Sequence, residues 1–149
     1  MISQTAEYAL RAAVWMAHMP DSCLTTQQIA EATRVPPGYL SKVLQALGRA
    51  GLVTSQRGLR GGFTLARGPE EVSVLEVINA VDPIKRIREC PLSLVSHGKK
   101  LCPLHSRLDE ALAGVEKVLA DSTLAELVAD SDNARPLCEN PNAAGAEPS

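Results

Sequence analysis

One segment, residues 35–66, constrains the fold of this chain more than any other, because it joins one helix pattern to two strand patterns. Pro37 suits a first helical position, where its missing N–H costs nothing, and Gly51 suits the left-handed position that ends a helix. Between them, aliphatic residues recur at the spacing of one buried helical face: Leu40, Val43, Leu44 and Leu47. We expect a helix that starts at Pro37, buries this stripe and ends before Gly51.

The opposite face of this helix carries residues that can hydrogen-bond or let another molecule approach closely: Gly38, Tyr39, Ser41, Lys42 and Gln45. Two short β-type runs follow, 52–55 and 63–66, and the loop between them contains Arg57, Arg60 and three glycines. Such a loop has little to bury, and its arginines suit contacts with phosphates or with a DNA minor groove. The pattern predicts a winged helix-turn-helix domain that binds DNA, in a mainly α fold with a small β-hairpin wing.

The chain before this segment predicts two further helices. Small apolar residues at helical spacing indicate a first helix over 3–18. Thr25 and Gln28 have the spacing of a capping box, which starts a second helix that ends by Arg34. A short turn joins this helix to the one that begins at Pro37, as in a helix-turn-helix.

The chain after the wing predicts a helix, a loop and a long helix. Ser73 and Glu76 form a capping box before a fourth helix. Residues 84–100 show neither helical nor strand periodicity of apolar residues, which predicts a loop. A long helix from about Pro103 has a narrow apolar stripe that suits packing against a second copy: Leu104, Leu108, Leu112, Val115 and Leu119. The expected units are a winged-helix domain over 1–82 whose first helix also joins the dimer interface, a sensor loop over 83–102, dimerisation and terminal helices over 103–130, and a disordered tail over 131–149.

The charge of the chain is unevenly distributed. The net charge is −2, but residues 1–68 carry seven Lys or Arg against three Asp or Glu, giving +4, and residues 69–149 carry −6. The basic part holds the helix and hairpin described above, as a DNA-binding surface requires. No apolar run approaches the roughly 20 residues of a membrane span, and the N-terminus lacks signal-peptide features, so we expect a cytoplasmic protein without a membrane partner.

Four cysteines in a cytoplasmic protein indicate thiols or metal ligands more than disulfides. Cys90, Cys102 and His105 lie close in sequence, and two thiolates with an imidazole could hold zinc or an iron–sulfur cluster. The interval between the cysteines is not that of a zinc finger, so uncoordinated thiols beside a surface histidine are an equal interpretation. An enzyme is not indicated, because no nucleophile–base pair is apparent and the glycines lie in a hairpin.

Several motifs together resemble one family of regulators. They lie in the first helix (7–10), the third helix and its turn (38–42 and 47–53), the wing (55–66), the fourth helix (77–81), the pair Cys102 and His105, and the terminal helix (123–127). On these motifs the chain resembles the IscR/NsrR-type winged-helix regulators of the Rrf2 family. Its members are bacterial homodimeric repressors and activators that often sense through an iron–sulfur cluster.

The resemblance implies how the domain would contact DNA. The third helix would enter the major groove through its N-terminal residues, which here are Gly38, Tyr39, Ser41 and Lys42. Arg57 and Arg60 of the wing would reach the minor groove. Two copies would read a palindromic operator in double-stranded DNA, with half-sites about 34 Å apart. Tyr39 has an alternative role, since it could pack on its own domain.

The resemblance also implies a cluster site, with one position altered. The family loop has three cysteines at six-residue intervals; Cys90 and Cys102 match the first and third, but Ser96 occupies the second. His105 matches a histidine ligand of one branch of the family. Because serine is a poor ligand for iron in a cluster, a [2Fe–2S] cluster with mixed thiolate and nitrogen or oxygen ligation is predicted.

The fourth ligand of such a cluster has two candidates. Glu7 matches a first-helix carboxylate that some members donate from the partner subunit, although a solvated surface charge is an equal interpretation. His97 lies beside the altered position. Without a cluster, a zinc site, thiol oxidation or a protein partner would control the same DNA-binding regulator.

Overall fold

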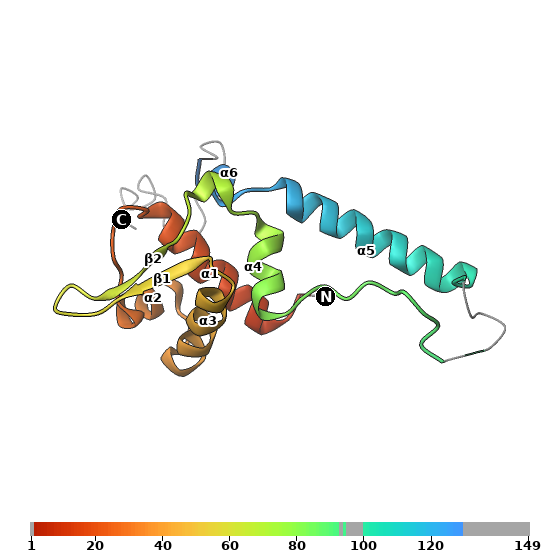
Figure 1. Ribbon diagram of the computed structural model, residues 1–149, viewed down its shortest axis with the longest axis horizontal. Helices are drawn as coiled ribbons and strands as arrows, with labels where there is room; N and C mark the ends of the chain where they lie inside the picture. Colours follow the sequence, from red (N-terminus) through yellow and green to blue (C-terminus); the bar gives the residue numbers. More distant parts are fainter. Residues whose placement is uncertain (1, 93, 95–99, 130–149) are drawn as a thin grey trace, which may run out of the picture.

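A computed structural model describes residues 2–92, 94 and 100–129 of the 149-residue chain. Its elements, in order, are α1 (Gln4–His18), α2 (Thr26–Thr33), α3 (Pro37–Arg49), β1 (Val53–Gln56), β2 (Gly62–Leu65), the 3₁₀ turn η1 (Pro69–Glu71), α4 (Val74–Val81), α5 (Pro103–Asp121) and α6 (Leu124–Ala129) (Figure 1). The two strands form one antiparallel hairpin. The predicted mainly helical fold with a β-hairpin wing is confirmed.

Local capping explains where most helices begin. The Ser3 hydroxyl accepts from the Ala6 N–H at 3.1 Å at the start of α1. The predicted capping box of α2 is formed in both directions: the Gln28 N–H donates to Thr25 Oγ1 at 3.1 Å, and the Thr25 N–H donates to Gln28 Oε1 at 2.9 Å. Such reciprocal bonds satisfy backbone donors that a helix start leaves unpaired.

The main core lies where α1, α2, α3 and α4 meet. Alanines on the inner face of α1 are almost fully buried, so neighbouring helices approach it closely, and α3 contributes its predicted stripe: Leu40, Val43, Leu44 and Leu47. Leu124 of α6 is fully buried in the same core. It is fixed there by a short bridge, in which the Leu124 N–H donates to the Val72 carbonyl at 2.9 Å. The C-terminal helix therefore completes the core of the N-terminal domain.

The wing hairpin is attached to the domain by a backbone bridge. Phe63 of β2 exchanges two backbone hydrogen bonds with Leu24, which lies just before α2, at 2.9 and 2.6 Å. Both strands start one residue away from the predicted runs. β1 begins at Val53 because the Leu52 N–H is used by the end of α3, where it donates to the Leu47 carbonyl at 3.0 Å.

Helix α5 extends away from this domain (Figure 1). None of its residues is fully buried. Its predicted stripe divides along the helix: Leu112 and Leu119 are half-buried, whereas Leu104 and Leu108 remain 62% and 47% exposed. Across the described ranges, no helix combines the length and the apolar character that a membrane crossing requires.

Candidate functional site

The outer face of α3 presents the residues expected to contact DNA. Gly38, Ser41 and Lys42 are exposed, and Tyr39 is 59% exposed. No heavy atom lies within 4 Å of the position that a Cβ would take at Gly38, so this part of the helix surface is open. The Ser41 hydroxyl donates to the Pro37 carbonyl at 3.1 Å, which leaves its oxygen as an acceptor.

Tyr39 also contacts its own domain. Its ring centroid lies 6.0 Å from that of Tyr8 on α1, with the two planes tilted by 58°. The Arg11 guanidinium lies 5.5 Å from the centroid of the Tyr8 ring and donates to the Thr33 carbonyl at 3.4 Å. These contacts connect the N-terminal end of α3 to α1 and to the end of α2.

The loop of the hairpin is exposed from Arg57 to Arg60. Gly58 has a φ of 113°, which favours glycine, and its carbonyl accepts from the Gly61 N–H at 2.9 Å to close the turn. Leu59, at the tip, is fully exposed and was not among the residues expected to be functional. An apolar residue between two arginines was its only sequence signal.

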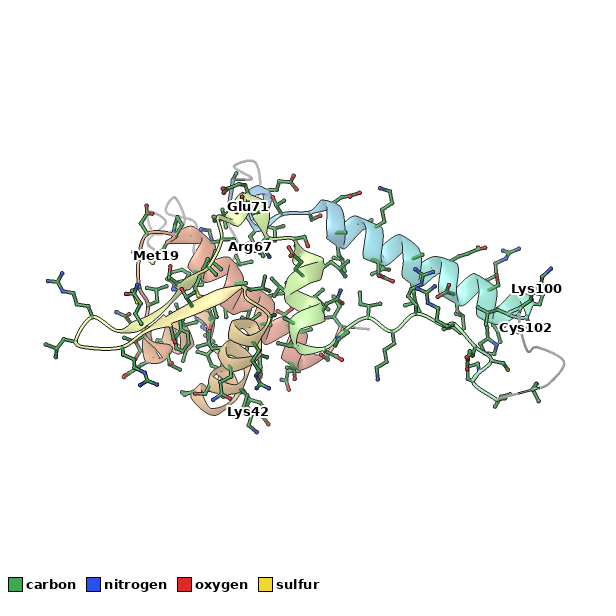
Figure 2. All side chains as sticks on the ribbon, in the orientation of Figure 1. Met19, Lys42, Arg67, Glu71, Lys100 and Cys102 are labelled. Carbon is green, nitrogen blue, oxygen red and sulfur yellow. The ribbon has the colours of Figure 1, made fainter. Side chains whose placement is uncertain are left out.

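The hairpin and α3 both lie far from the cysteine-containing region. In Figure 2, Lys42 marks the lower end of the domain and the hairpin projects from one side, while Cys102 lies at the distant end of α5. The two predicted sites therefore lie at opposite ends of the folded molecule. Any signal from one to the other must pass through the domain or through a second subunit.

Cys102 directly precedes α5, as its N-cap residue. Its Sγ lies 3.2 Å from Nδ1 of His105, one helical turn further along. Cys90 is half-buried in the segment that follows α4, and Cys23, Cys90 and Cys102 are thiols rather than disulfides. Ser96 and His97 lie outside the described residues.

The described donors fit part of a metal site. Cys102 and His105 are in contact, but no group of three or more His, Cys, Asp or Glu side chains in the described ranges is arranged to hold a metal ion. Glu7 is not beside this pair in its own chain: its Oε1 accepts from Arg11 Nε at 3.1 Å, and its side chain is 53% exposed. It is accessible to a second subunit, and a metal would compete with Arg11 for it.

An ion-pair cluster that no sequence pattern indicated joins α5 to the segment after α4. Arg86 forms a bidentate pair with Asp109, with Nε to Oδ1 and Nη2 to Oδ2 both at 2.7 Å, and its Nη1 lies 3.4 Å from Oε1 of Glu116. The Ile87 N–H also donates to Asp109 Oδ1 at 2.9 Å. The hydrogen bonds from Arg86 lower the pKa of Asp109 to about 2, although partial burial opposes this shift. The residues lie 23 and 30 positions apart, so no local pattern revealed them.

Comparisons with known proteins agree with this architecture. A family model described as "Rrf2: Iron-dependent Transcriptional regulator" matches residues 2–130. The HTH-type transcriptional regulator NsrR of Shouchella clausii (strain KSM-K16) is 30% identical over 141 residues, which cover 93% of this chain and 95% of that protein.

Two solved structures extend the comparison to the fold. IscR of T. potens has a TM-score of 0.73 at 25% identity, covering 88% of each chain. The oxidized form of Staphylococcus aureus CymR has a TM-score of 0.70 at 25% identity, covering 89% of this chain and 99% of that one. The family model spans nearly all of the described residues, and the chain belongs to the Rrf2 family of transcriptional regulators.

Proposed function

We propose that this protein is a bacterial cytoplasmic regulator that binds a palindromic operator in double-stranded DNA as a homodimer. The observation that carries the proposal is the outer face of α3: it is polar and open, it lies over a fully buried aliphatic stripe, and it adjoins a basic hairpin. In a helix-turn-helix protein this face reads the major groove. Family membership supports DNA binding as the general activity.

Each candidate residue has a role in this proposal. Gly38 lets the DNA backbone or a base edge approach, and Ser41 offers an acceptor oxygen. Lys42 supplies a positive charge for a phosphate. Arg57 and Arg60, on an exposed glycine-rich turn, insert into the minor groove beside the same half-site.

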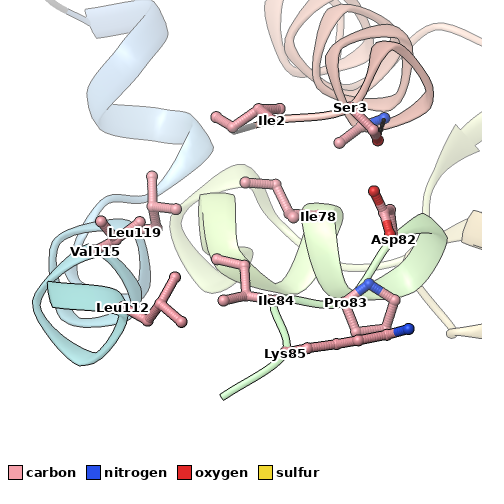
Figure 3. A pocket seen from close by; sticks show the side chains of 11 residues that line it. Ile2, Ser3, Ile78, Asp82, Pro83, Ile84, Lys85, Leu112, Val115 and Leu119 are labelled. Carbon is pink, nitrogen blue, oxygen red and sulfur yellow. Dashed lines mark hydrogen bonds between the residues drawn. The ribbon is translucent and has the colours of Figure 1, made fainter. Parts of the chain in front are cut away.

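The homodimer is proposed from the unpartnered surface of α5. Leu104, Leu108 and Val118 are 62%, 47% and 65% exposed on this helix. Beside them, a groove of about 390 Å³ is lined by the start of α1, the end of α4 and the inner side of α5 (Figure 3). Figure 3 shows Ile2 and Ile78 facing Leu112 and Leu119 across it. A second copy of the apolar helix would cover these surfaces, since burial of each leucine contributes about 1.5–3 kcal/mol.

The sensing function is proposed as a [2Fe–2S] cluster held by Cys90, Cys102 and His105. The contact between Cys102 and His105 supports this donor set, and the fourth ligand would be Glu7 of the partner subunit or His97. A bound cluster would supply redox or nitric-oxide reactivity. The protein residues would hold it at the start of α5, with mixed thiolate and nitrogen or oxygen donors.

A second candidate is the same regulator without a cluster. Ser96 in place of the central family cysteine favours it, as does the existence of an oxidized form of the related Staphylococcus aureus CymR. In this case thiol oxidation, zinc or a protein partner would change the affinity for DNA. DNA binding itself would be the same in both cases.

Two measurements test the proposal. Selection from a random duplex library should yield a palindrome, and footprinting should show protection on one face over two successive helical turns. A visible spectrum with iron and sulfide assays on anaerobically purified protein should give about two irons and two sulfides per chain. Failure to select any sequence would contradict the DNA-binding proposal, whereas colourless protein that binds a palindrome would favour the second candidate.

A further inference from the structure

Residues 83–90, which we call the strap, connect α4 to the cysteine-containing region. The strap has no helix or strand of its own; it runs along α5 in the opposite direction, and its last part turns away from the helix (Figure 1). At its start, the Ile84 N–H donates to Asn79 Oδ1 at 3.2 Å, and the Ile84 side chain packs in a cluster that includes Leu119. At its end lies Cys90.

The middle of the strap is fixed to α5 by Asp109. This carboxylate accepts two hydrogen bonds from the Arg86 guanidinium and one from the Ile87 N–H, all between 2.7 and 2.9 Å. Bidentate pairs between arginine and carboxylate fix direction as well as distance. The Arg86 and Asp109 side chains are only 25% and 17% exposed, so this contact is partly shielded from water.

The strap contacts the same face of α5 that carries two candidate ligands nearer its start. Cys102, His105, Asp109 and Glu116 are spaced by three, four and seven residues, which places all four on one side of a helix. Asp109 and Glu116 contact Arg86 of the strap. Cys102 and His105 continue the same face towards the start of α5.

The rise per residue predicts where the strap brings Cys90. An extended chain advances about 3.3 Å per residue and an α-helix about 1.5 Å, so three strap residues match between six and seven helix residues. Ile87 lies beside Asp109, so Ile84, three residues earlier in the strap, should lie beside position 116 of α5. Ile84 does line the groove together with Val115 and Leu119. Counting forward by the same amount, an extended course would bring Cys90 to the level of Cys102 and His105; the strap bends at Glu89, just before this point.

We propose that Arg86 and Asp109 are positioning residues that set Cys90 opposite Cys102 and His105. The inference rests on the proposed ligand set. Neither Arg86 nor Asp109 is a ligand in that set; the pair fixes the position of one ligand, Cys90. Glu116 supports the pair by binding the remaining arm of the guanidinium. Loss of the pair would leave each thiol in place on its own element, but Cys90 would no longer be held in register with Cys102.

The test measures this register without any cluster. In the full-length protein with Cys23→Ser and Cys138→Ser, diamide oxidises Cys90 and Cys102 to an intramolecular disulfide, detected as a loss of two hydrogens by mass spectrometry. We expect Arg86→Ala and Asp109→Asn to slow this reaction about tenfold, because they lower the effective concentration of one thiol at the other. Arg86→Lys, which keeps the charge but not the bidentate geometry, should slow it less.

Controls distinguish a change in the relative position of Cys90 and Cys102 from a change in the accessibility of either thiol and from unfolding. Lys117→Ala removes a charge that pairs with Asp121 on α5 and should leave the disulfide rate unchanged. Alkylation of Cys90 and Cys102 by iodoacetamide should proceed at wild-type rates in every variant, since the accessibility of each thiol is retained. Circular dichroism and operator binding, measured on the variants before diamide is added, report whether the domain is intact.

The possible results are distinguishable. A disulfide rate that is unchanged or faster in both Arg86→Ala and Asp109→Asn would overturn the positioning role, whatever the protein binds. A slowed rate in protein that selects no DNA or assembles no cluster would support the positioning role while contradicting the proposed function. If Arg86→Ala unfolds, Asp109→Asn and Arg86→Lys decide the question.

Discussion

The rings of Tyr8 and Tyr39 pack against each other, with centroids 6.0 Å apart, across the boundary between α1 and α3. Tyr39 is nevertheless 59% exposed. The two interpretations of Tyr39, a DNA contact and a packing residue, are therefore compatible: the ring contacts Tyr8, and its exposed part is available to DNA. Tyr8 would then affect DNA binding without touching DNA.

Removal of the Tyr8 ring should weaken operator binding indirectly. Aromatic pairs contribute about 0.5–1.5 kcal/mol beyond area burial, so Tyr8→Ala should weaken binding roughly two- to tenfold by releasing Tyr39. Tyr8→Phe keeps the ring and should bind as the wild type does. Fluorescence anisotropy with a labelled operator measures both, and equal affinities for Tyr8→Ala and Tyr8→Phe would show that the pair does not orient Tyr39.

The wing arginines should contribute through charge. Arg57→Ala and Arg60→Ala should each weaken operator binding and reduce the slope of log affinity against log salt by about one. Lys117→Ala is a control with the same charge change on α5, away from the wing. A salt slope that is the same in Arg57→Ala and Lys117→Ala would remove Arg57 from the interface. Circular dichroism should be unchanged throughout, because both wing side chains are exposed.

Two glycines should give opposite results on substitution by alanine. A Cβ at Gly62 would collide with the Leu24 carbonyl, at the bridge that fixes the wing, so Gly62→Ala should destabilise the fold by more than about 1 kcal/mol. A Cβ at Gly38 would enter open space, and alanine is the better helix former by up to about 1 kcal/mol. Gly38→Ala should therefore be as stable as the wild type or more so, yet bind the operator less tightly.

Urea unfolding and operator binding, measured on both glycine variants, separate these effects. Loss of stability in Gly38→Ala would show that this residue has a structural role. Wild-type affinity in the same variant would show that DNA does not approach the helix at that position. Unchanged stability in Gly62→Ala would mean that the wing can move away from Leu24 without cost.

Local signals explain why much of the fold could be predicted. The two capping boxes, Pro37 at the start of α3 and Gly51 in a left-handed conformation with a φ of 76° all depend on residues within one turn. Such signals require no knowledge of the rest of the chain. The strand limits moved by one residue because the end of α3 competes for the Leu52 N–H.

Contacts between distant residues explain what the sequence did not predict. The bridge between Leu24 and Phe63 joins backbone groups, which carry no residue-specific signal. The pair Arg86 and Asp109 is specific, but many other pairings of charged residues were equally consistent with the sequence. For the candidate site, the short spacing of Cys102 and His105 explains their contact one helical turn apart, whereas the position of Cys90 depends on the strap.

The exposed leucines of α5 should be required for dimerisation. Leu108→Glu should weaken the dimer at least tenfold, because it replaces an apolar contact with a charge that must be desolvated. Lys117→Glu places the same carboxylate on the opposite side of the helix, at a site that is 77% exposed, and should leave the dimer intact. Light scattering after size-exclusion chromatography measures the mass. A stable dimer of Leu108→Glu would place the interface elsewhere.

The pair Arg86 and Asp109 should stabilise the fold in a defined pH range. Hydrogen bonds from Arg86 hold the pKa of Asp109 at about 2 in the folded chain, below its ordinary value of about 3.9. A carboxyl whose folded pKa is depressed stabilises the fold above its unfolded pKa, and this contribution is lost as the pH falls towards the folded value. The positive charges that act on Asp109 are those of Arg86 and Arg88, and Glu116 shares the Arg86 guanidinium.

The difference in Tm between the wild type and Asp109→Asn should therefore be constant from about pH 5 to pH 8 and shrink between about pH 4 and pH 2. The comparison cancels the titration of carboxyl groups that both proteins share. Thermal unfolding at fixed ionic strength measures it, since salt screens a pair that is partly exposed. A difference that stays constant between pH 4 and pH 2, or that grows as the pH falls, would show that the folded pKa of Asp109 is not depressed, and that Arg86 does not hold the strap through an ionised carboxylate.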